Sequence, residues 1–383
     1  MDRIYLDYAA SAPVLPEVLD AMLPFFMGTY GNPSGVHADA RETRRAVEQA
    51  RRQAAAAIGA ENREILFTSG GSESDNLAIR GTAFALREKG KHIVTARTEH
   101  PAVLNTCRAL EKQGFRVTYL TPDRYGVISP DQVREAIGPE TILVSIMAAN
   151  NEIGTVEPVA EIGAACRERG VLFHTDAVQA AGMLKLDVAE MNADLLSLSA
   201  HKFHGPKGTG ILYVRKGTRL EPLITGGPQE RGLRAGTENV PGIVGTGKAI
   251  ELAEAGREEN CRKIRELRDL LVRLVTERIP EAQLNGHPEK RLPNNCSFSF
   301  AGIESEALLL RLDLAGISAS GGSACTSGSM EPSHVLQAIG LEEEMAKGSI
   351  RLTLGRETAR EEIEKTAQIL PEIVADLRSM RGL

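Results

Sequence analysis

The chain has 383 residues, of which 42% are hydrophobic and 25% are charged. This is the composition of an ordinary globular protein, and the length predicts two domains because a single core seldom grows this large. The net charge is −6 and Lys and Arg form no block, so we expect no direct binding of nucleic acid. No apolar run approaches the ~18 residues that a membrane span needs, so we expect no membrane contact.

The N-terminal segment and the cysteines predict a cytoplasmic protein. Asp2 and Asp7 interrupt the region where a signal peptide would have its apolar core. The five cysteines are an odd number and have no CxxC spacing; they are Cys107, Cys166, Cys261, Cys296 and Cys325. This argues against a disulfide framework and against a zinc site, and favours a reducing cytosol. We expect no metal site.

Helix and strand patterns alternate over the first two-thirds of the chain. Residues 40–59, rich in Ala, Arg, Glu and Gln, predict a helix, and residues 64–69 predict a short buried strand. A Gly-Gly turn and a helix from about Glu73 follow. Further strands are predicted at 92–96, 115–120, 141–147, 171–177, 194–200 and 210–215, with helices such as 101–114 and 161–170 between them. This alternation predicts an α/β fold, with a mostly parallel sheet covered by helices on both faces.

The pattern changes after about Pro241. One long helix is predicted over 247–279, strands at 294–300 and 349–355, and helices at 304–316 and 358–380. We expect Pro371 to kink or break the last helix. These elements predict a smaller α+β domain. We place the large domain at residues 16–250 and the small domain at 1–15 and 251–383.

The turn after the first strand of the predicted sheet is suited to an anion. The backbone N–H groups of Gly71 and Ser72 would point outwards at a helix N-terminus, where negative charge is favoured, and the Ser72 hydroxyl adds a donor. An ordinary glycine turn with a serine cap explains the same residues. The motif alone leaves both interpretations open.

Two later strand ends carry an acid and an amine. A carboxylate such as Asp176 at a buried strand end is costly unless it meets a cation, and a protonated pyridine nitrogen would be one; a helix cap is the alternative. Gln179 follows three residues later. Lys202, at the end of the next strand, could lose its proton on desolvation and form an imine, although most lysines at strand ends are merely solvated. Ser199 and His201 flank it as donors suited to a phosphate.

Together these three motifs supply what pyridoxal phosphate requires: an amine for an imine, an acid for the ring nitrogen and a cradle for the phosphate. The chain resembles fold-type-I pyridoxal-phosphate enzymes and, within the class V aminotransferase group, the cysteine desulfurases of the NifS/IscS class. The matching motifs run nearly end to end: YLDYAASAP, GNPSGVH, FTSGGSESDNLAIRG, TEHPAVLNTC, NNEIGTVEP, HTDAVQAAG, SAHKFHGPKGTG, ERGLRAGTENV, SGGSACTSGS and SIRLTLGRET. The loop 318–330, of the SGSACTS type, is the most specific of them.

The resemblance implies roles for the cofactor residues. Lys202 resembles the imine lysine, which later moves the Cα proton, and Asp176 resembles the partner of the ring nitrogen. Gln179 matches the residue that hydrogen-bonds the ring hydroxyl, and His100 matches a histidine that stacks on the ring and could move protons. The phosphate cradle corresponds to Gly71, Ser72, Ser199 and His201. The family often has Ala-Thr where this chain has Gly71-Ser72, but a hydroxyl is kept.

The resemblance also implies a substrate site and a second subunit. Asn151, chosen over Asn150 by its spacing to Asp176, and Arg351 match the residues that hold the substrate carboxylate; a planar guanidinium suits this because it can form two hydrogen bonds to a carboxylate. Thr237 matches a threonine that reaches the phosphate of the neighbouring subunit. We therefore expect a homodimer.

Cys325 is the expected acceptor of sulfur. The implied reaction converts L-cysteine to L-alanine, with Cys325 becoming a persulfide that passes its sulfur to an acceptor protein, either an iron–sulfur scaffold or a thiolation enzyme acting on tRNA or a cofactor. Gly and Ser in loop 318–330 restrict the backbone least, which suits a thiol that must travel. The other four cysteines are interpreted as packing or surface residues. In the IscS branch a longer C-terminal segment helps to dock the scaffold; here 32 residues follow Arg351, which weighs against docking of that kind.

Two alternatives remain. The same fold also supports transamination, β-elimination of cystine and selenocysteine lysis, and Cys325 is the residue that separates these from desulfuration. A subunit that keeps the fold but acts only as a scaffold for partners is the other hypothesis, and the presence of all the matched positions weighs against it.

Overall fold

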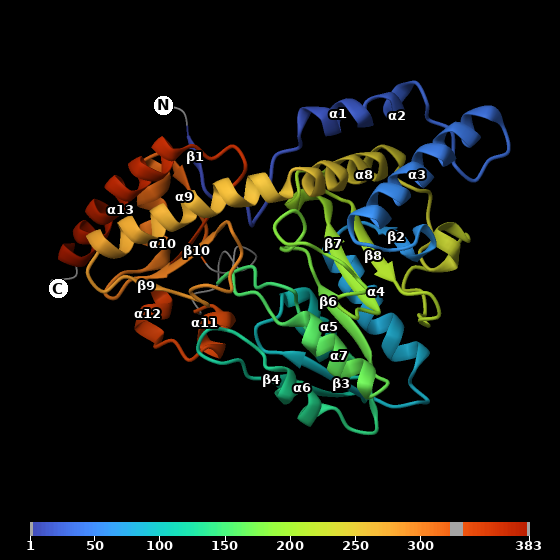
Figure 1. The fold of residues 1–383 in the computed structure, drawn as a ribbon, viewed down its shortest axis with the longest axis horizontal. Coiled ribbons are helices and arrows are strands. Elements are labelled where there is room, and N and C mark those ends of the chain that lie inside the picture. Colours follow the sequence, from blue (N-terminus) through green and yellow to red (C-terminus); the bar gives the residue numbers. More distant parts are fainter. Residues whose placement is uncertain (1–2, 322–331, 381–383) are drawn as a thin grey trace.

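The computed structural model describes residues 3–321 and 332–380 (Figure 1). Its largest sheet has seven strands in the order β2-β8-β7-β6-β5-β3-β4. Only β8 is antiparallel to its neighbours; the other strands share one direction, which confirms the predicted mostly parallel sheet. The strands are β2 (Ile65–Thr68), β3 (His92–Ala96), β4 (Arg116–Leu120), β5 (Thr141–Ser145), β6 (Leu172–Asp176), β7 (Leu195–Ser199) and β8 (Gly210–Val214).

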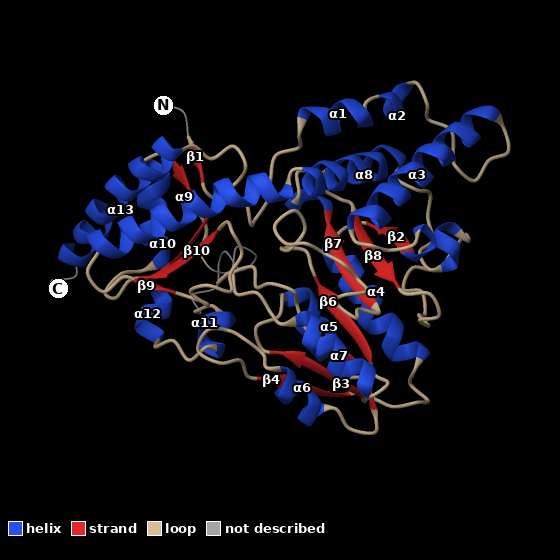
Figure 2. Ribbon diagram, viewed as in Figure 1, coloured by secondary structure: helices blue, strands red, loops and turns tan. Residues whose placement is uncertain are grey.

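Helices cover both faces of this sheet (Figure 2). Side chains alternate along each strand, so that Leu196 and Leu198 enter one hydrophobic core and Leu195 enters the other. The first core is closed by α3 (Ala38–Ala57), α6 (Pro130–Ala136), α7 (Val159–Glu168) and α8 (Val240–Ala255). The second is closed by α4 (Gly71–Ala85) and α5 (Pro101–Glu111). A sheet buried on both faces explains why its strands read as continuous apolar runs.

A separate core lies in the C-terminal third of the chain and includes Ile4 and Leu6 from the N-terminal segment. It packs α9 (Arg257–Arg278), α10 (Ser305–Leu314) and α13 (Arg360–Met380) against an antiparallel sheet of β12 (Ser349–Thr353), β10 (Asn295–Ser299) and β9 (Gln283–Leu284). β1 (Ile4–Tyr5) pairs in parallel with β11 (Ile317–Ser318). The remaining helices are α1 (Pro16–Met22), α2 (Pro24–Met27), α11 (His334–Ala338) and α12 (Glu343–Lys347), with short 3₁₀ turns η1 (Asn62–Glu64), η2 (Ala200–Lys202) and η3 (Gln229–Gly232).

The long helix predicted over 247–279 is in fact two helices. α8 begins at Val240, where the Asn239 side chain accepts a hydrogen bond from the N–H of Gly242. Its last residue is Ala255, and Gly256 is its C-cap. α9 starts at the next residue. The sequence pattern missed the Asn239 cap and the junction because both helices have continuous helical composition across Gly256.

Pro371 was predicted to kink or break this helix; it does not break it, because α13 continues through Pro371. A proline lacks the N–H that would normally donate to the carbonyl four residues earlier, here that of Ala367. Arg278 of α9 donates its Nη1 to this carbonyl at 3.0 Å. A neighbouring helix therefore replaces the missing hydrogen bond and lets the helix remain continuous.

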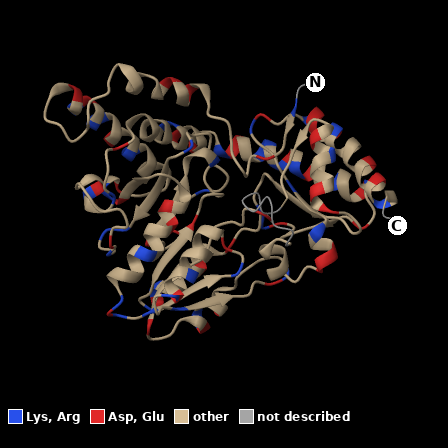
Figure 3. Ribbon diagram, turned by 180° about the vertical axis from the view of Figure 1, so that it is seen from behind, with Lys and Arg blue, Asp and Glu red and all other residues tan. Residues whose placement is uncertain are grey.

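Charges of both signs are interspersed along the surface helices, including α9 and α13 (Figure 3). Pairs one turn apart, such as Arg262 with Glu266 and Arg360 with Glu364, bring opposite charges together. Among the helices in the described ranges, none has both the length and the apolar character required to cross a membrane.

A buried ion pair ties the loop before α8 to the large sheet. Arg51 of α3 donates Nη1 and Nη2 to Glu230 at 2.8 and 2.9 Å, and both residues are less than a tenth exposed. Glu230 also accepts the backbone N–H of Phe67 in β2 at 3.3 Å. Glu230 and Arg231 both have left-handed backbone angles, φ 43° and 59°, which are unfavourable for residues with a Cβ. The ion pair thus holds an unfavourable loop conformation in place.

We predict that Glu230→Gln lowers the free energy of unfolding by about 3–5 kcal/mol, because it leaves the buried Arg51 guanidinium without its full counter-charge. Glu48→Gln is the matched control, since Glu48 also contacts Arg51 at 3.1 Å but is 47% exposed in its side chain. Its loss should stay below about 1 kcal/mol. Urea unfolding measures both, and equal losses would contradict the prediction.

Candidate active site

The carboxyl ends of β2, β6 and β7 meet at one edge of the large sheet, and a cavity of about 880 Å³ opens there. Most of the predicted site residues line it: Gly71, Ser72, His100, Asn151, Asp176, Gln179, Ser199, His201, Lys202 and Arg351. Thr237 does not line it; this residue is exposed on the loop before α8. Cys325 lies outside the described residues.

One end of the cavity is suited to an anion. α4 begins at Gly71, so the N–H groups of its first turn have no acceptor within the helix and the positive end of the helix dipole faces the cavity. A Cβ on Gly71 would lie 2.9 Å from Cγ2 of Val178, so a larger residue here would require the Val178 side chain to shift. Glu73, in the same turn, is paired with Arg234 at 3.0 Å and accepts the N–H of Ser69 at 2.8 Å. Its charge therefore does not oppose an anion here.

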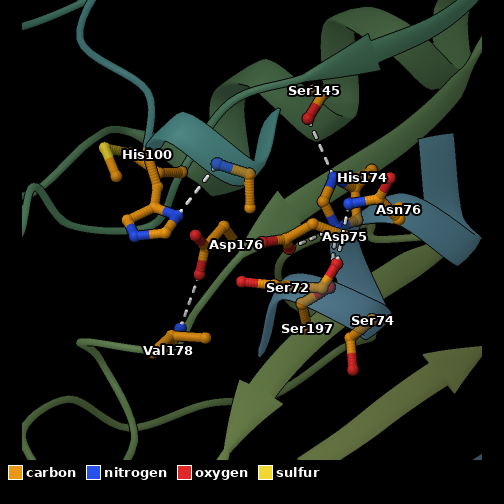
Figure 4. Close-up of polar contacts among 12 residues, drawn as sticks. Ser72, Ser74, Asp75, Asn76, His100, Ser145, His174, Asp176, Val178 and Ser197 are labelled. Atoms are coloured by element: carbon orange, nitrogen blue, oxygen red, sulfur yellow. Dashed lines mark hydrogen bonds and ion pairs between the residues drawn. The ribbon is translucent and has the colours of Figure 1, made fainter. Parts of the chain in front are cut away.

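Asp176 stands at the other end, where β6 stops. Its carboxylate is buried, and Oδ1 accepts the N–H of Val178 at 2.9 Å (Figure 4). Burial raises the pKa of Asp176, while the neighbouring His100 and Lys202 act in the opposite direction. A cation entering the cavity would favour the charged carboxylate.

Lys202 follows β7 in the turn η2 and points at the N-terminal segment. Its Nζ donates to the carbonyls of Ala9 and Ala10 at 2.6 and 2.8 Å. Gln179 donates Nε2 to the same Ala9 carbonyl at 3.0 Å. Residues 9–11 thus form one wall of the cavity. The sequence motif YLDYAASAP contains them, but sequence reasoning gave them no role.

His100 caps α5 by accepting the N–H of Ala102 on Nδ1 at 3.1 Å. In the neutral ring the proton is therefore on Nε2. Burial lowers the pKa of His100, although Asp176 opposes this. The imidazole is thus neutral near pH 7, with an N–H to donate.

Arg351 lies in β12 and is 2% exposed. It donates Nη1 to the Asn151 carbonyl at 2.8 Å and Nη2 to Asp7 at 3.0 Å, while its Nε has no hydrogen-bond partner among the described residues. Asn150 is buried, and its Oδ1 accepts the N–H groups of Glu152 and Ile153, so Asn151 is the asparagine that lines the cavity. Sequence reasoning missed Asp7, the counter-charge of Arg351.

The four described cysteines are all buried. Burial raises the pKa of Cys107, Cys166 and Cys296 to about 12 and also raises that of Cys261. These thiols stay protonated at neutral pH and are poor nucleophiles. Sequence analysis interpreted them as packing or surface residues; all four are packing residues.

The described residues on both sides of the gap at 322–331 lie near the cavity. Before it, Ser320 and Arg351 exchange two backbone hydrogen bonds, at 2.7 and 3.3 Å. After it, Pro332, Ser333 and His334 line the cavity, and His334 donates Nε2 to the Glu99 carbonyl at 3.0 Å. Residues 320 and 332–334, which flank the segment that contains Cys325, therefore lie beside the cavity or its Arg351 wall.

These residues fit pyridoxal phosphate. A helix N-terminus with nearby hydroxyls, a buried carboxylate and an amine share one cavity, and Gly71 packs closely against Val178 at the anion end. The cavity size lies within the range of small-molecule and cofactor sites.

Comparison with known proteins agrees with this geometry. Residues 4–366 match the family described as aminotransferase class-V. The chain belongs to the class-V aminotransferase family. It is 55% identical over 380 residues to the cysteine desulfurase IscS of Methanosarcina thermophila, covering 99% of this chain and 94% of that one. This confirms the predicted resemblance to cysteine desulfurases, whose family depends on pyridoxal phosphate.

Two solved structures share the fold. One, a NifS-like protein, superposes with a TM-score of 0.92 at 38% identity, covering 98% of this chain and all of that one. The other, SspA in complex with cysteine, has a TM-score of 0.82 at 42% identity over 93% of this chain and all of its own. These similarities confirm the predicted fold-type-I architecture.

We predict that Asp176→Asn weakens binding of pyridoxal phosphate by about 100-fold or more, because a buried cation loses its counter-charge. Absorbance titration of the cofactor-free protein measures this. Asp194→Asn is the control, since Asp194 also accepts a strand N–H, that of Phe173, but does not line the cavity. Equal affinities of the Asp176 variant and the wild type would contradict the assignment.

Glu157, six residues after Asn151, makes the free energy of unfolding depend on pH. Burial raises the pKa of Glu157 to about 8, from an ordinary value of 4.5. The folded state therefore binds the proton more tightly, and this contribution to stability is present below pH 4.5 and lost as the pH rises through 8. We predict that Glu157→Gln, which can still accept the Ile128 N–H, flattens the decline of the free energy of unfolding between pH 5 and 9 by about 2–5 kcal/mol.

Urea unfolding at several pH values measures this effect, with Glu161→Gln at an exposed position as the control. Parallel pH profiles for the wild type and the Glu157 variant would show that Glu157 does not titrate in this range.

Proposed function

We propose that this chain takes sulfur from L-cysteine, releases L-alanine and holds the sulfur as a persulfide on Cys325. The observation that carries this proposal is the cavity at the strand ends, where Lys202, Asp176 and Arg351 converge beside both attachment points of the segment 322–331. Membership of the family and the likeness to SspA in complex with cysteine support it.

Pyridoxal phosphate, when bound, withdraws electrons from the Cα of an amino acid and so activates the Cα proton and the Cβ–S bond. The first turn of α4, with Ser72, Ser199 and His201, would hold its phosphate. Asp176 would keep its ring nitrogen protonated, and Gln179 would bond the ring hydroxyl.

The chain's own residues orient the substrate and move its protons. Arg351, with an unpaired Nε, and Asn151 would hold the substrate carboxylate. Lys202 would take the Cα proton, since its amine lines the cavity and is positioned there by the Ala9 and Ala10 carbonyls. The Nε2–H of the neutral His100 is available to donate a hydrogen bond to a bound molecule, because Nδ1 is already an acceptor.

The sulfur step balances without an added oxidant. The Cys325 thiolate attacks the sulfur of the substrate, so that an S–S bond forms and the Cβ–S bond breaks. The substrate carbon is reduced to a methyl group and its sulfur is oxidised to the persulfide level. The thiol proton of Cys325 accounts for the additional hydrogen of alanine.

Cys325 is the proposed nucleophile because the other cysteines are buried and protonated. It follows Gly321 by four residues, and an extended chain covers at most about 3.6 Å per residue, so the covalent chain keeps it within about 14 Å of Gly321. This distance suits delivery to the cavity.

We also propose a cytoplasmic homodimer in which Thr237 reaches the cavity of the second subunit. Thr237 is exposed and lies outside the cavity of its own chain. Large apolar side chains are exposed around α1 and α2, as expected of a subunit interface: Leu19, Leu23, Phe26, Met27, Tyr30 and Val36.

We further propose that the chain divides into a large domain of residues 16–250 and a small domain of residues 1–15 and 251–383. The separate hydrophobic cores support this division. The acceptor of the sulfur is an iron–sulfur scaffold or a thiolation enzyme.

We predict that Cys325→Ser lowers alanine and sulfide formation from L-cysteine at least about 100-fold while the yellow cofactor colour and its change on adding cysteine persist, because only the nucleophile is removed. Alanine is quantified with and without a reductant. Cys261→Ser is the matched control, since serine can keep the hydrogen bonds to the Gly182 and Met183 carbonyls, and its activity should stay near that of the wild type.

Other outcomes point to the alternatives. Undiminished sulfide release by Cys325→Ser would favour elimination chemistry, as in a cystine or selenocysteine lyase. Failure of the wild-type protein to bind pyridoxal phosphate would favour a scaffold without catalytic function.

A further inference from the structure

A second acid, Asp75, lines the cavity beside Asp176. Asp75, in α4, is 1% exposed. One carboxylate oxygen of Asp75, one of Asp176 and one ring nitrogen of His100 all lie within 4.8 Å of one another (Figure 4). Neither sequence reasoning nor the proposed reaction gives Asp75 a role. A buried acid next to a buried acid needs an explanation, because two like charges at this separation destabilise each other.

The immediate neighbours of Asp75 provide no clear counter-charge. The Ser197 hydroxyl hydrogen-bonds the carboxyl group, and within the described ranges Oδ1 has no hydrogen-bond partner. His174 Nε2 is 3.7 Å from Oδ1. Both ring nitrogens of His174 are already engaged by hydroxyls, those of Ser145 at 2.8 Å and Ser197 at 3.0 Å (Figure 4). Burial lowers the pKa of His174 to about 3, so this imidazole is neutral.

Lys202 favours the charged form of Asp176. The groups that act on Asp75, besides its burial, are Asp176 and the Ser197 hydroxyl. Glu99, behind His100, is fully buried, accepts the Met147 N–H, and burial raises its pKa well above the ordinary value. Burial, and next the charge of Asp176, likewise raise the pKa of Asp75. The proton of the acid pair therefore belongs on Asp75.

We propose that Asp75 is a positioning residue for Asp176: in the cofactor-loaded enzyme it stays a neutral carboxylic acid, so that Asp176 alone carries the negative charge that faces the ring nitrogen. This inference rests on the proposed role of Asp176. An ionised Asp75 would increase the proton affinity of Asp176 and draw the proton away from the ring nitrogen. A neutral Asp75 leaves Asp176 charged and the ring cationic, which the withdrawal of electrons requires.

Infrared spectroscopy of the holoenzyme at neutral pH tests the protonation state directly. Protein labelled with ¹³C in the aspartate side-chain carboxyl distinguishes a protonated aspartic acid from the buried glutamic acids Glu99, Glu152 and Glu157, whose carbonyl bands do not shift. We expect one carbonyl band of a protonated carboxyl that shifts with the label and is absent from Asp75→Asn. Asp194→Asn, which removes a half-buried acid away from the cavity, should leave that band in place.

The affinity for pyridoxal phosphate provides a second readout. Asp75→Ala removes the polar group and should weaken binding about tenfold, whereas Asp75→Asn, which is neutral and of the same shape, should restore it to within about threefold of the wild type. Should Asp75→Asn fail to fold, Ser197→Ala replaces it in the infrared experiment, because loss of the Ser197 hydroxyl must shift the Asp75 band.

Several results would overturn the inference: no label-sensitive band in the wild-type holoenzyme, a band that persists in Asp75→Asn or is unmoved in Ser197→Ala, or weaker cofactor binding by Asp75→Asn than by Asp75→Ala. None of these affects the Cys325→Ser test of sulfur transfer. Conversely, cofactor binding that is insensitive to Asp176→Asn would refute the role of Asp176 itself, and this outcome is distinct from a failure of Asp75 alone.

Discussion

The site depends on the shared direction of β2, β6 and β7. Because these strands are parallel, their carboxyl ends open at one edge, and three segments far apart in the sequence deliver an anion-binding turn, an acid and an amine to the same space. The strand β8 lies between β2 and β7 and is antiparallel to both. β2 therefore runs in the same direction as β7 and β6. Helices on both faces bury the sheet, so the polar groups at its ends work in surroundings of low polarity, where charge interactions are strong.

Such surroundings require each buried charge to have a partner, and the partners come from distant segments. Arg351 is balanced by Asp7, Glu73 by Arg234, and Arg51 by Glu230. The last two pairs fasten the loop that carries Thr237 to α4 and α3. The loop is thus anchored at the anion end of its own cavity, although Thr237 itself is exposed and does not line that cavity. Asp75, like Glu99 and Glu157, is a buried acid whose pKa is raised by burial.

The sequence was informative where a function is encoded locally. The turn at Gly71, the strand-end Asp176 and the Lys202 turn each have a residue pattern with a physical meaning, and their positions at one sheet edge follow from strand–helix alternation. The groups that were missed are defined by tertiary contacts: Asp7 opposite Arg351, the Ala9 carbonyl under Lys202, and Asp75 beside Asp176. Pro371 shows the same limit, because the arginine that supports its helix lies 93 residues earlier in the chain. The proposed role of Thr237 could come only from resemblance, since the proposal places it at the cavity of a second subunit.

The N-terminal segment has a further consequence. Within five residues it supplies Asp7 to the guanidinium of Arg351 and the Ala9 carbonyl to the amine of Lys202. An incoming amino acid carries one group for each: its carboxylate competes for the guanidinium, and its own amine arrives near the lysine. The short segment between Asp7 and Ser11 therefore contacts both groups, through the Asp7 carboxylate and the Ala9 and Ala10 carbonyls, and a molecule that binds either group must share or replace the corresponding contact.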